Sequence, residues 1–237
     1  MAVTDRLRRI FEDSEVANRE RIIEYARDLG PFERILDLGC YDGEFTAQLA
    51  AAAGASEVEG VEFLEEHASK ARERGITVTP ANLNEPLPFA DGRFDLVHAN
   101  QVIEHLKGTD LFLREIARIL KPGGTAIVST NNLASWHNIG SLVLGYQPFP
   151  NHVSDETHVG NPLNPRHGVA HEDAGQTHLR IFTGRALDEL AEHHGLEVVE
   201  SGVSGYYPLT GKAARRVAEL NPSHAAFLIG VYRRPAG

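Results

Sequence analysis

Apolar and polar positions follow two regular patterns between residues 34 and 130 of the 237-residue chain. Short apolar runs predict buried strands, and stretches in which apolar residues recur every three or four positions predict amphipathic helices. Strands and helices that alternate in this way predict an α/β fold with a doubly wound parallel sheet, whose ligand lies beyond the carboxyl ends of the strands. The strands are expected at 34–38, 57–61, 76–80, 94–99 and 125–130, and the helices at 43–53, 64–74, 101–106 and 109–120.

The segments on either side of this core have patterns of their own. Residues 4–29 carry an interrupted apolar face and predict one or two helices that end at Gly30-Pro31. Such helices either cover a ligand or simply pack on the sheet. After residue 182, two further helices (183–194 and 211–219) and two further strands (196–203 and 225–232) are expected to complete the sheet.

Residues 146–178 break the alternation. They are rich in Pro, Asn and Gly, contain five histidines and keep no helical or strand period. A long irregular segment inside a compact domain is usually either functional or disordered. Because this segment follows the fifth strand, it is expected over the carboxyl edge of the sheet, and we interpret it as a lid over a substrate.

Composition narrows the class of partner. A formal net charge of −10 argues against an extended surface for the phosphates of a nucleic acid. One cysteine excludes an intramolecular disulfide and fits a reducing compartment. No run of 18 apolar residues predicts a membrane span, and the first residues lack the apolar region of a secretory signal. We therefore expect a cytoplasmic protein that does not bind a membrane.

The turn after the first strand offers the strongest candidate for ligand binding. Gly39 and Gly43 flank a strand-to-helix turn, a place where the backbone can approach a ligand closely. Glu62 follows the second strand, where an acid can accept hydrogen bonds from both ribose hydroxyls. The turn alone is equally typical of an ordinary strand–helix connection.

Six stretches taken together are more specific. They are LDLGCYDG, VEGVE, LNEPLPFADGRFDLV, QVIEHL, FLREIARILKPGG and IVSTNN, which span roughly residues 30–135 in this order. In these stretches the chain resembles the class I S-adenosylmethionine-dependent methyltransferases of the small-molecule and quinone type. The resemblance implies a seven-stranded, mostly parallel Rossmann-like sheet with an antiparallel last strand. It also implies S-adenosylmethionine as the cofactor and S-adenosylhomocysteine as the product.

The resemblance divides the chain into parts of a single methyltransferase domain, 1–237. The parts are an N-terminal helical cover (1–30), a cofactor-binding core (31–135), a substrate lid insert (136–180) and the C-terminal part of the sheet (181–237).

The resemblance also implies roles for cofactor-binding residues. The methionine end of the cofactor would meet the first turn, the ribose would meet Glu62, and the adenine would meet Phe63 and the residues after the third strand. Two positions depart from the family: Tyr41 replaces a common glycine, and Asn82 replaces a common Asp. The full set is Asp37, Gly39, Cys40, Gly43, Glu62, Phe63, Asn82, Leu83 and Asn100, the last at the floor of the methyl-transfer site.

Gln101, Glu104 and His105 fall on one face of a helix at spacings of three and four residues. Some members of the family carry Glu-x-x-Glu-His here and bind a divalent metal, but Gln101 replaces the first Glu. Three interpretations stay open: a structural Glu104–His105 pair, a catalytic base at His105, and a metal site. We assign no metal ligand, and a divalent metal is an alternative that we do not favour.

Six more histidines gather between the fifth strand and the next helix, and one of them is a candidate base for an acceptor hydroxyl. Their spacing matches no compact zinc pattern, so most are interpreted as polar loop residues. His137 and His178 are the better candidates, and with His105 they form the predicted catalytic set. The six are His137, His152, His158, His167, His171 and His178.

These features predict methyl transfer to an oxygen or nitrogen of a small molecule, for example a hydroxylated secondary metabolite, a sugar or a quinone. The alternatives are a cofactor-binding protein without catalysis and an RNA methyltransferase, against which the net charge counts. A nicotinamide-dependent oxidoreductase is a weaker alternative, because the loop has no third glycine in a G-x-G-x-x-G arrangement. No feature of the sequence indicates an oligomeric state.

Overall fold

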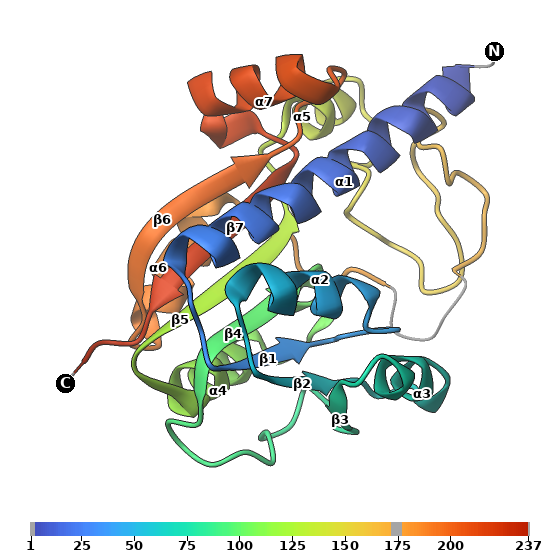
Figure 1. The fold of residues 1–237 in the computed structure, drawn as a ribbon. Helices are drawn as coiled ribbons and strands as arrows, with labels where there is room; N and C mark the ends of the chain where they lie inside the picture. Colours follow the sequence, from blue (N-terminus) through green and yellow to red (C-terminus); the bar gives the residue numbers. More distant parts are fainter. Residues whose placement is uncertain (1–2, 172–176, 237) are drawn as a thin grey trace.

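Seven strands form one sheet in the computed structural model, which describes residues 3–171 and 177–236. Their order across the sheet is β3-β2-β1-β4-β5-β7-β6, and β7 runs antiparallel to both β5 and β6 (Figure 1). The predicted doubly wound, mostly parallel sheet with an antiparallel last strand is therefore confirmed. The strands are β1 (Arg34–Leu38), β2 (Glu57–Val61), β3 (Thr77–Thr79), β4 (Phe94–Asn100), β5 (Leu120–Asn131), β6 (Glu197–Ser204) and β7 (Phe227–Arg233).

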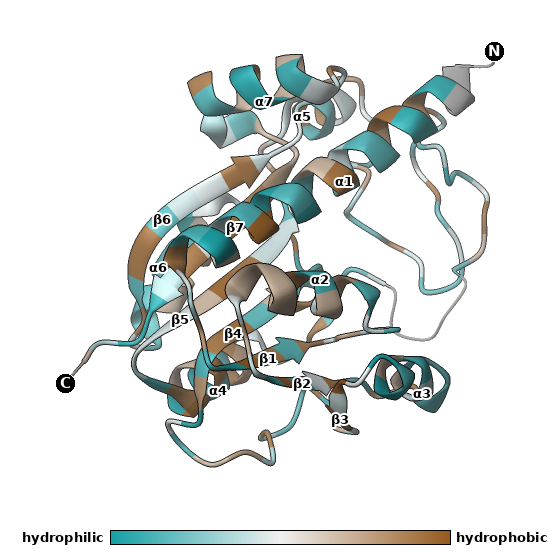
Figure 2. Cartoon of the chain, in the orientation of Figure 1, coloured by the Kyte–Doolittle hydropathy of each residue, from teal (hydrophilic) through white to brown (hydrophobic). Residues whose placement is uncertain are grey.

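Helices lie on both faces of the sheet because its central strands are apolar on both sides. In β1, Ile35 packs toward α1 and α2, whereas its neighbour Leu36 packs on the opposite face, toward α4 and α6. Figure 2 shows α1 alternating between hydrophilic and hydrophobic residues along its length, as expected of a helix with one buried side. The helices are α1 (Val3–Leu29), α2 (Glu44–Ala53), α3 (Glu65–Glu73), α4 (Thr109–Ile119), α5 (Trp136–Val143), α6 (Gly184–His193) and α7 (Gly211–Leu220), with short 3-10 turns at Ile103–His105 and Pro222–His224.

The long helix α1 packs on the sheet at one end and extends beyond the sheet at the other (Figure 1). Its C-terminal half packs on the sheet through Ile22, Tyr25 and Ala26, all of which are buried. Its N-terminal half projects past the carboxyl ends of the strands and runs beside the insert (Figure 1). A single helix thus belongs to the core at one end and to the candidate site at the other.

Buried polar groups fix α1 to the carboxyl edge of the sheet. Asn18 is 2% exposed, and its side-chain N–H donates to Oδ1 of Asn100, at the end of β4, over 2.9 Å. Its Oδ1 accepts from the hydroxyls of Ser129 in β5 and Ser204 in β6, at 3.1 and 3.0 Å. A buried amide is costly unless it is hydrogen-bonded, so this network favours one position of α1 on the sheet.

One helix was missed by the sequence analysis. Helix α5 follows β5, where no element was expected, and it exposes Leu142, Val143 and Leu144 by 58–80%. The buried residues of this helix, Asn138 and Ser141, are polar, so the helix has no buried apolar stripe that a sequence pattern could reveal. The other differences are small: the segment expected as helix 101–106 is only a 3-10 turn, and β5 starts five residues early.

Residues 146–171 and 177–182, which comprise the described parts of the insert and the residues that lead from it to α6, contain no helix and no strand. Backbone hydrogen bonds nevertheless join two stretches of the insert around an isolated antiparallel bridge between Thr157 and Ala170. The N–H of His158 donates to the carbonyl of Val169, and the N–H of His171 donates to the carbonyl of Glu156. At the end of the insert, the N–H groups of Leu179 and Arg180 both donate to the carbonyl of Glu104. No helix among the described residues is long and apolar enough to cross a membrane.

Candidate active site

The turn after β1 is bound to the end of β2. The carbonyl of Val61 accepts hydrogen bonds from the N–H groups of both Gly39 (2.9 Å) and Cys40 (3.0 Å). Gly39 has a φ of 81°, and a Cβ there would lie 2.8 Å from Val102, so glycine is required on both counts. Tyr41 also has a left-handed φ of 48°, and its side chain points outward, 56% exposed, with its ring on His67. The departure from glycine at this position therefore leaves the shape of the turn intact.

Gly43 and Cys40 have packing roles in the same turn. A Cβ at Gly43 would lie 2.5 Å from Ile76 and 2.9 Å from Ala71, so glycine lets α3 approach. Cys40 fills the space above Gly60 in β2. Burial raises the pKa of the Cys40 thiol to about 12, which keeps it protonated and unreactive.

Glu62, directly after β2, is joined to the turn. Its Oε2 accepts from the N–H of Tyr41 at 3.1 Å, and its Oε1 accepts from the N–H of Leu64 at 2.9 Å. Each carboxylate oxygen has a further lone pair, and the side chain is only half-buried, so it can also accept from a ligand. Phe63 is beside it and 71% exposed. The predicted ribose-binding carboxylate and the predicted adenine-binding ring are therefore both accessible at the end of β2.

Asp37 is more enclosed than the sequence suggested. It is 3% exposed, and its two oxygens lie 2.7 Å from Nδ1 of His98 and 2.5 Å from the hydroxyl of Thr46. Sequence analysis missed His98, although a histidine in the middle of the apolar strand FDLVHAN indicates a buried polar partner. Asp37 and His98 are paired residues on the neighbouring strands β1 and β4, so their contact holds the end of β1 just before the glycine turn.

Asn82 and Leu83 lie in the segment after β3. Oδ1 of Asn82 accepts from the backbone N–H of Asn84 at 3.0 Å, and its amide donates to Glu85 at 3.1 Å. The replacement of Asp by Asn therefore keeps an acceptor that shapes the loop. Leu83 is half-buried against the core.

Beyond the ends of β4 and β5, Gln101 and Asn131 form part of a polar floor. Asn131 donates to Oε1 of Gln101 at 2.8 Å and to Oε1 of Glu104 at 3.3 Å. Gln101 is held with a left-handed φ of 56°, an uncommon conformation for a residue other than glycine. Strain of this kind is often found in functional sites.

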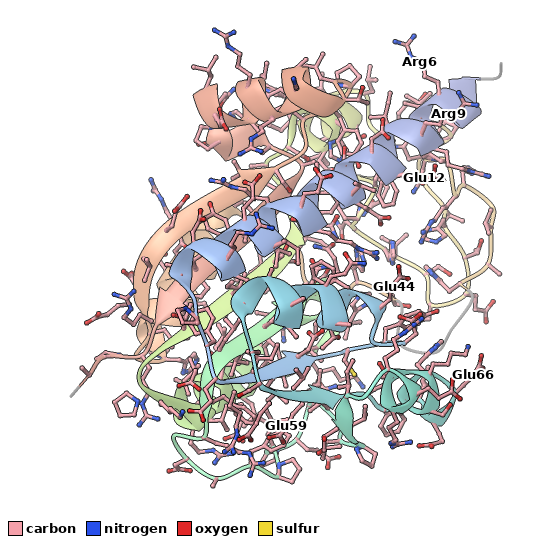
Figure 3. All side chains as sticks on the ribbon, in the orientation of Figure 1. Arg6, Arg9, Glu12, Glu44, Glu59 and Glu66 are labelled. Carbon is pink, nitrogen blue, oxygen red and sulfur yellow. The ribbon has the colours of Figure 1, made fainter. Side chains whose placement is uncertain are left out.

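A cavity of about 670 Å³ lies above this floor. This is the usual size of a small-molecule site. Arg8, Phe11, Glu12 and Glu15 of α1 line one wall, and Figure 3 shows Glu12 on the projecting half of the helix. The remaining lining comes from the floor residues Gln101, His105 and Asn131, from the insert, and from His137, Tyr207 and Ala226.

Glu104 lies beneath the cavity and is completely buried. The hydroxyl of Thr130 donates to its Oε2 at 2.9 Å. Burial raises the pKa of the Glu104 carboxyl from 4.5 to about 7, although its hydrogen bonds oppose the rise. The carboxyl therefore titrates near neutral pH, a property that the sequence analysis did not assign to it.

All three predicted catalytic histidines line the cavity. The ring centroids of His105 and His178 are 4.7 Å apart. Nδ1 of His105 lies 3.2 Å from the carbonyl oxygen of Thr177, and Nδ1 of His178 lies 2.8 Å from the carbonyl oxygen of Pro150. Donation from Nδ1 leaves the lone pair of each ring on Nε2. His137 contacts the ring of Tyr207, and burial lowers the pKa of both His137 and His178 to about 3. Those two rings are therefore neutral at neutral pH and weak as bases.

Three of the histidines that the sequence analysis interpreted as polar loop residues lie close together in the structure. His152, His158 and His171 converge, with one nitrogen of each within 4.8 Å of the others. The backbone turns of the insert bring together residues that are 6 and 13 positions apart, so spacing in the sequence could not reveal them. Glu104, His105 and His178 form a second such group, whereas His167 is exposed.

Comparisons with known proteins agree with this architecture. A family model described as a methyltransferase domain matches residues 6–201. A malonyl-[acyl-carrier protein] O-methyltransferase from Erwinia pyrifoliae is 35% identical over 130 residues, 51% of this chain and 48% of that protein. A probable S-adenosylmethionine-dependent methyltransferase from Mycolicibacterium smegmatis is 32% identical over 183 residues, 71% of this chain and 63% of that protein. The chain thus spans between about half and two thirds of the length of these relatives.

A solved structure shows the same fold. The S-adenosylmethionine-dependent methyltransferase from Mesorhizobium loti has a TM-score of 0.57 and 19% identity, over 86% of this chain and 92% of that chain. The family model covers most of the chain. The chain therefore belongs to the family of class I S-adenosylmethionine-dependent methyltransferases.

Proposed function

We propose that this chain transfers a methyl group from S-adenosylmethionine to an oxygen or nitrogen of a small, polar molecule. One observation carries the proposal: the glycine turn and Glu62 lie at the same sheet edge as a cavity of about 670 Å³ with a polar floor. S-adenosylmethionine supplies a methyl group bound to a sulfonium, which an acceptor can attack in line. The protein's task is then to align the two molecules and exclude water.

The residues at the edge of the sheet fit the cofactor. Glu62 would accept from the ribose hydroxyls, and the exposed ring of Phe63 would lie against the adenine. The backbone at Gly39, Cys40 and Gly43 would face the methionine end, with Asp37 acting from beneath the turn. Asn82 and Leu83 would meet the adenine edge, and Asn100 would lie at the floor of the methyl-transfer site.

The insert and the N-terminal half of α1 would form the acceptor side. We assign residues 136–180 to a lid and residues 1–30 to a cover, since both line the cavity. An acceptor hydroxyl or amine needs a proton acceptor, and His105 fits this role best because it lines the cavity and its Nδ1 lies near a backbone carbonyl. His137 and His178, with their low pKa values, would serve as neutral hydrogen-bond acceptors. The O-methyltransferase among the relatives supports oxygen as the acceptor atom.

Replacing Glu62 with Ala should weaken S-adenosylhomocysteine binding by about 1–3 kcal/mol, or roughly 5- to 150-fold, because charged hydrogen bonds to the ribose are lost. Isothermal titration calorimetry measures the change. Glu66→Ala is the matched control, since Glu66 lies in the first turn of α3, is exposed, and forms an ion pair only with Lys70 among the described residues (Figure 3). Equal affinities for the two variants would remove Glu62 from the cofactor site.

Replacing residues 146–178 with a short glycine–serine linker should leave the affinity for S-adenosylhomocysteine within about threefold of the intact chain. None of the residues assigned to the cofactor lies in this segment. The same calorimetric titration measures the affinity, and circular dichroism checks that the shortened chain is folded. A folded deletion variant that no longer binds would place the insert in the cofactor site and contradict its assignment as a lid.

Glu104→Gln should change how stability depends on pH. Because the folded chain raises the pKa of Glu104 from 4.5 to about 7, its contribution to stability is complete below pH 4.5 and is lost as the pH rises through 7. Gln cannot ionise, so the variant does not lose this stability as the pH rises. The free energy of unfolding of the variant minus that of the wild type should therefore increase by roughly 2–3 kcal/mol between pH 5 and pH 8.

Urea unfolding at several pH values measures this difference. Glu189→Gln, at an exposed position of α6, is the matched control and should follow the wild-type curve. A Glu104→Gln curve that stays parallel to the wild type would show that the carboxyl is already ionised at pH 5.

A further inference from the structure

Three histidines of the insert form one wall of the cavity. The ring centroids of His152 and His158 are 4.8 Å apart, those of His152 and His171 are 4.9 Å apart, and those of His158 and His171 are 4.3 Å apart. One ring nitrogen of each lies within 4.8 Å of the other two, and all three residues line the cavity. His158 and His171 flank the isolated antiparallel bridge between Thr157 and Ala170, and His152 comes from an earlier stretch of the same segment, so their convergence is a property of the fold.

Two of the three rings, those of His152 and His158, are held in the neutral form that a metal ion needs. Burial lowers the pKa of His152 and of His158 to about 4, and the neighbouring His171 and Arg166 lower both further. His105 also faces His152 and acts in the same direction. Neutral imidazole has a lone pair for a metal, whereas three protonated rings at this separation would repel one another.

The surroundings of two of the rings already suit a metal. Nε2 of His171 lies 3.2 Å from the carbonyl of Ser154, and donation to this carbonyl leaves a lone pair on Nδ1. Metal-binding histidines typically donate their other N–H to a backbone carbonyl in this way. Nδ1 of His158 is buried and has no hydrogen-bond partner in the part of the chain that the structure describes, so a buried polar atom there is unexplained.

His152 is the ring that has to change its partner. Its Nδ1 accepts a hydrogen bond from the backbone N–H of His178 at 3.1 Å. Metal binding at Nδ1 would exchange this hydrogen bond for a metal–nitrogen bond, and binding at Nε2 would require the other tautomer. Either change is local, because His152 is only half-buried.

We propose that His152, His158 and His171 bind one divalent transition-metal ion, Zn²⁺ in the first instance, with an open coordination position facing the cavity. Imidazole nitrogens suit Zn²⁺, Co²⁺ and Ni²⁺, whereas Mg²⁺ and Ca²⁺ require oxygen ligands. Three protein ligands and one open position is the arrangement of zinc sites that bind water or a substrate oxygen. The ion would also cross-link separate stretches of the insert and hold that wall of the cavity in place.

The neighbouring group of Glu104, His105 and His178 is a competing location. His178 stacks on His152 at 4.4 Å, so the two groups are adjacent. The insert site is favoured because Glu104 is 0% exposed and both of its oxygens already accept hydrogen bonds from Thr130 and Asn131. All three ligands of the insert site, in contrast, reach the cavity.

Cobalt binding tests the proposal without any assay of methyl transfer. Untagged protein is freed of metal with a chelator and titrated with Co²⁺, whose visible absorption reports binding, and Zn²⁺ is then added as a competitor. The wild type should bind one Co²⁺ per chain and release it to Zn²⁺. His158→Ala and His171→Ala should each weaken binding by about 100-fold or more, since loss of a ligand exceeds loss of an outer hydrogen-bond partner.

Two control variants decide the location. His167→Ala removes an exposed histidine of the same insert, and Glu104→Gln removes the carboxylate of the neighbouring group; both should retain Co²⁺ affinity within about threefold. If His158→Ala does not fold, His171→Ala alone decides, because His171 is only half-buried.

Three results would overturn the proposal. The first is a wild type that shows no saturable binding of one Co²⁺. The second is a His171→Ala variant that binds as tightly as the wild type. The third is loss of binding in Glu104→Gln with retention in His171→Ala, which would move the ion to the neighbouring group.

Discussion

A single carbonyl group organises the candidate cofactor site. Val61 O accepts from both Gly39 and Cys40, which binds the turn after β1 to the end of β2. The next residue, Glu62, then accepts from the backbone N–H of Tyr41. Because the two parallel strands end side by side, these few hydrogen bonds put the glycine turn and the acidic residue within reach of one ligand.

The proposed acceptor site depends on buried side-chain hydrogen bonds that position α1. Asn18 links α1 to the ends of β4, β5 and β6 through buried side chains, and it does so next to the floor of the cavity. The projecting half of α1 and the insert then enclose the space above that floor (Figure 1). The cavity walls combine Arg8 and Arg166 with Glu12, Glu15 and several neutral histidines, so the enclosure is polar but carries no strong excess of one charge. This balance of charges supports the proposed polar, hydroxylated acceptor over a nucleic acid.

Much of this architecture could be predicted from the sequence, because it follows from local patterns. The apolar runs located six of the seven strands to within about two residues at each end, while β5 began five residues earlier than expected. Gly39 and Glu62 could be identified as candidate cofactor-binding residues because each directly follows a strand in the sequence. Gly39 has the left-handed φ that its position required.

The features that the sequence did not predict depend on contacts between residues that are distant in sequence, or on helix faces without a periodic apolar pattern. The Asp37–His98 pair joins strands that are 61 residues apart, and helix α5 has no buried stripe. The convergence of His152, His158 and His171 arises from turns of an irregular segment, which no periodicity describes. The raised pKa of Glu104 comes from complete burial, which its place beside His105 in the sequence did not reveal.

Calorimetric titration of the wild-type chain with S-adenosylhomocysteine, with NADH as the control ligand, tests the central claim most directly. The arrangement of Glu62 and the glycine turn predicts saturable binding of one S-adenosylhomocysteine per chain, with a dissociation constant in the micromolar range (about −8 kcal/mol), and no binding of NADH. Binding of NADH instead, or of neither ligand, would contradict the assignment of this sheet edge to S-adenosylmethionine.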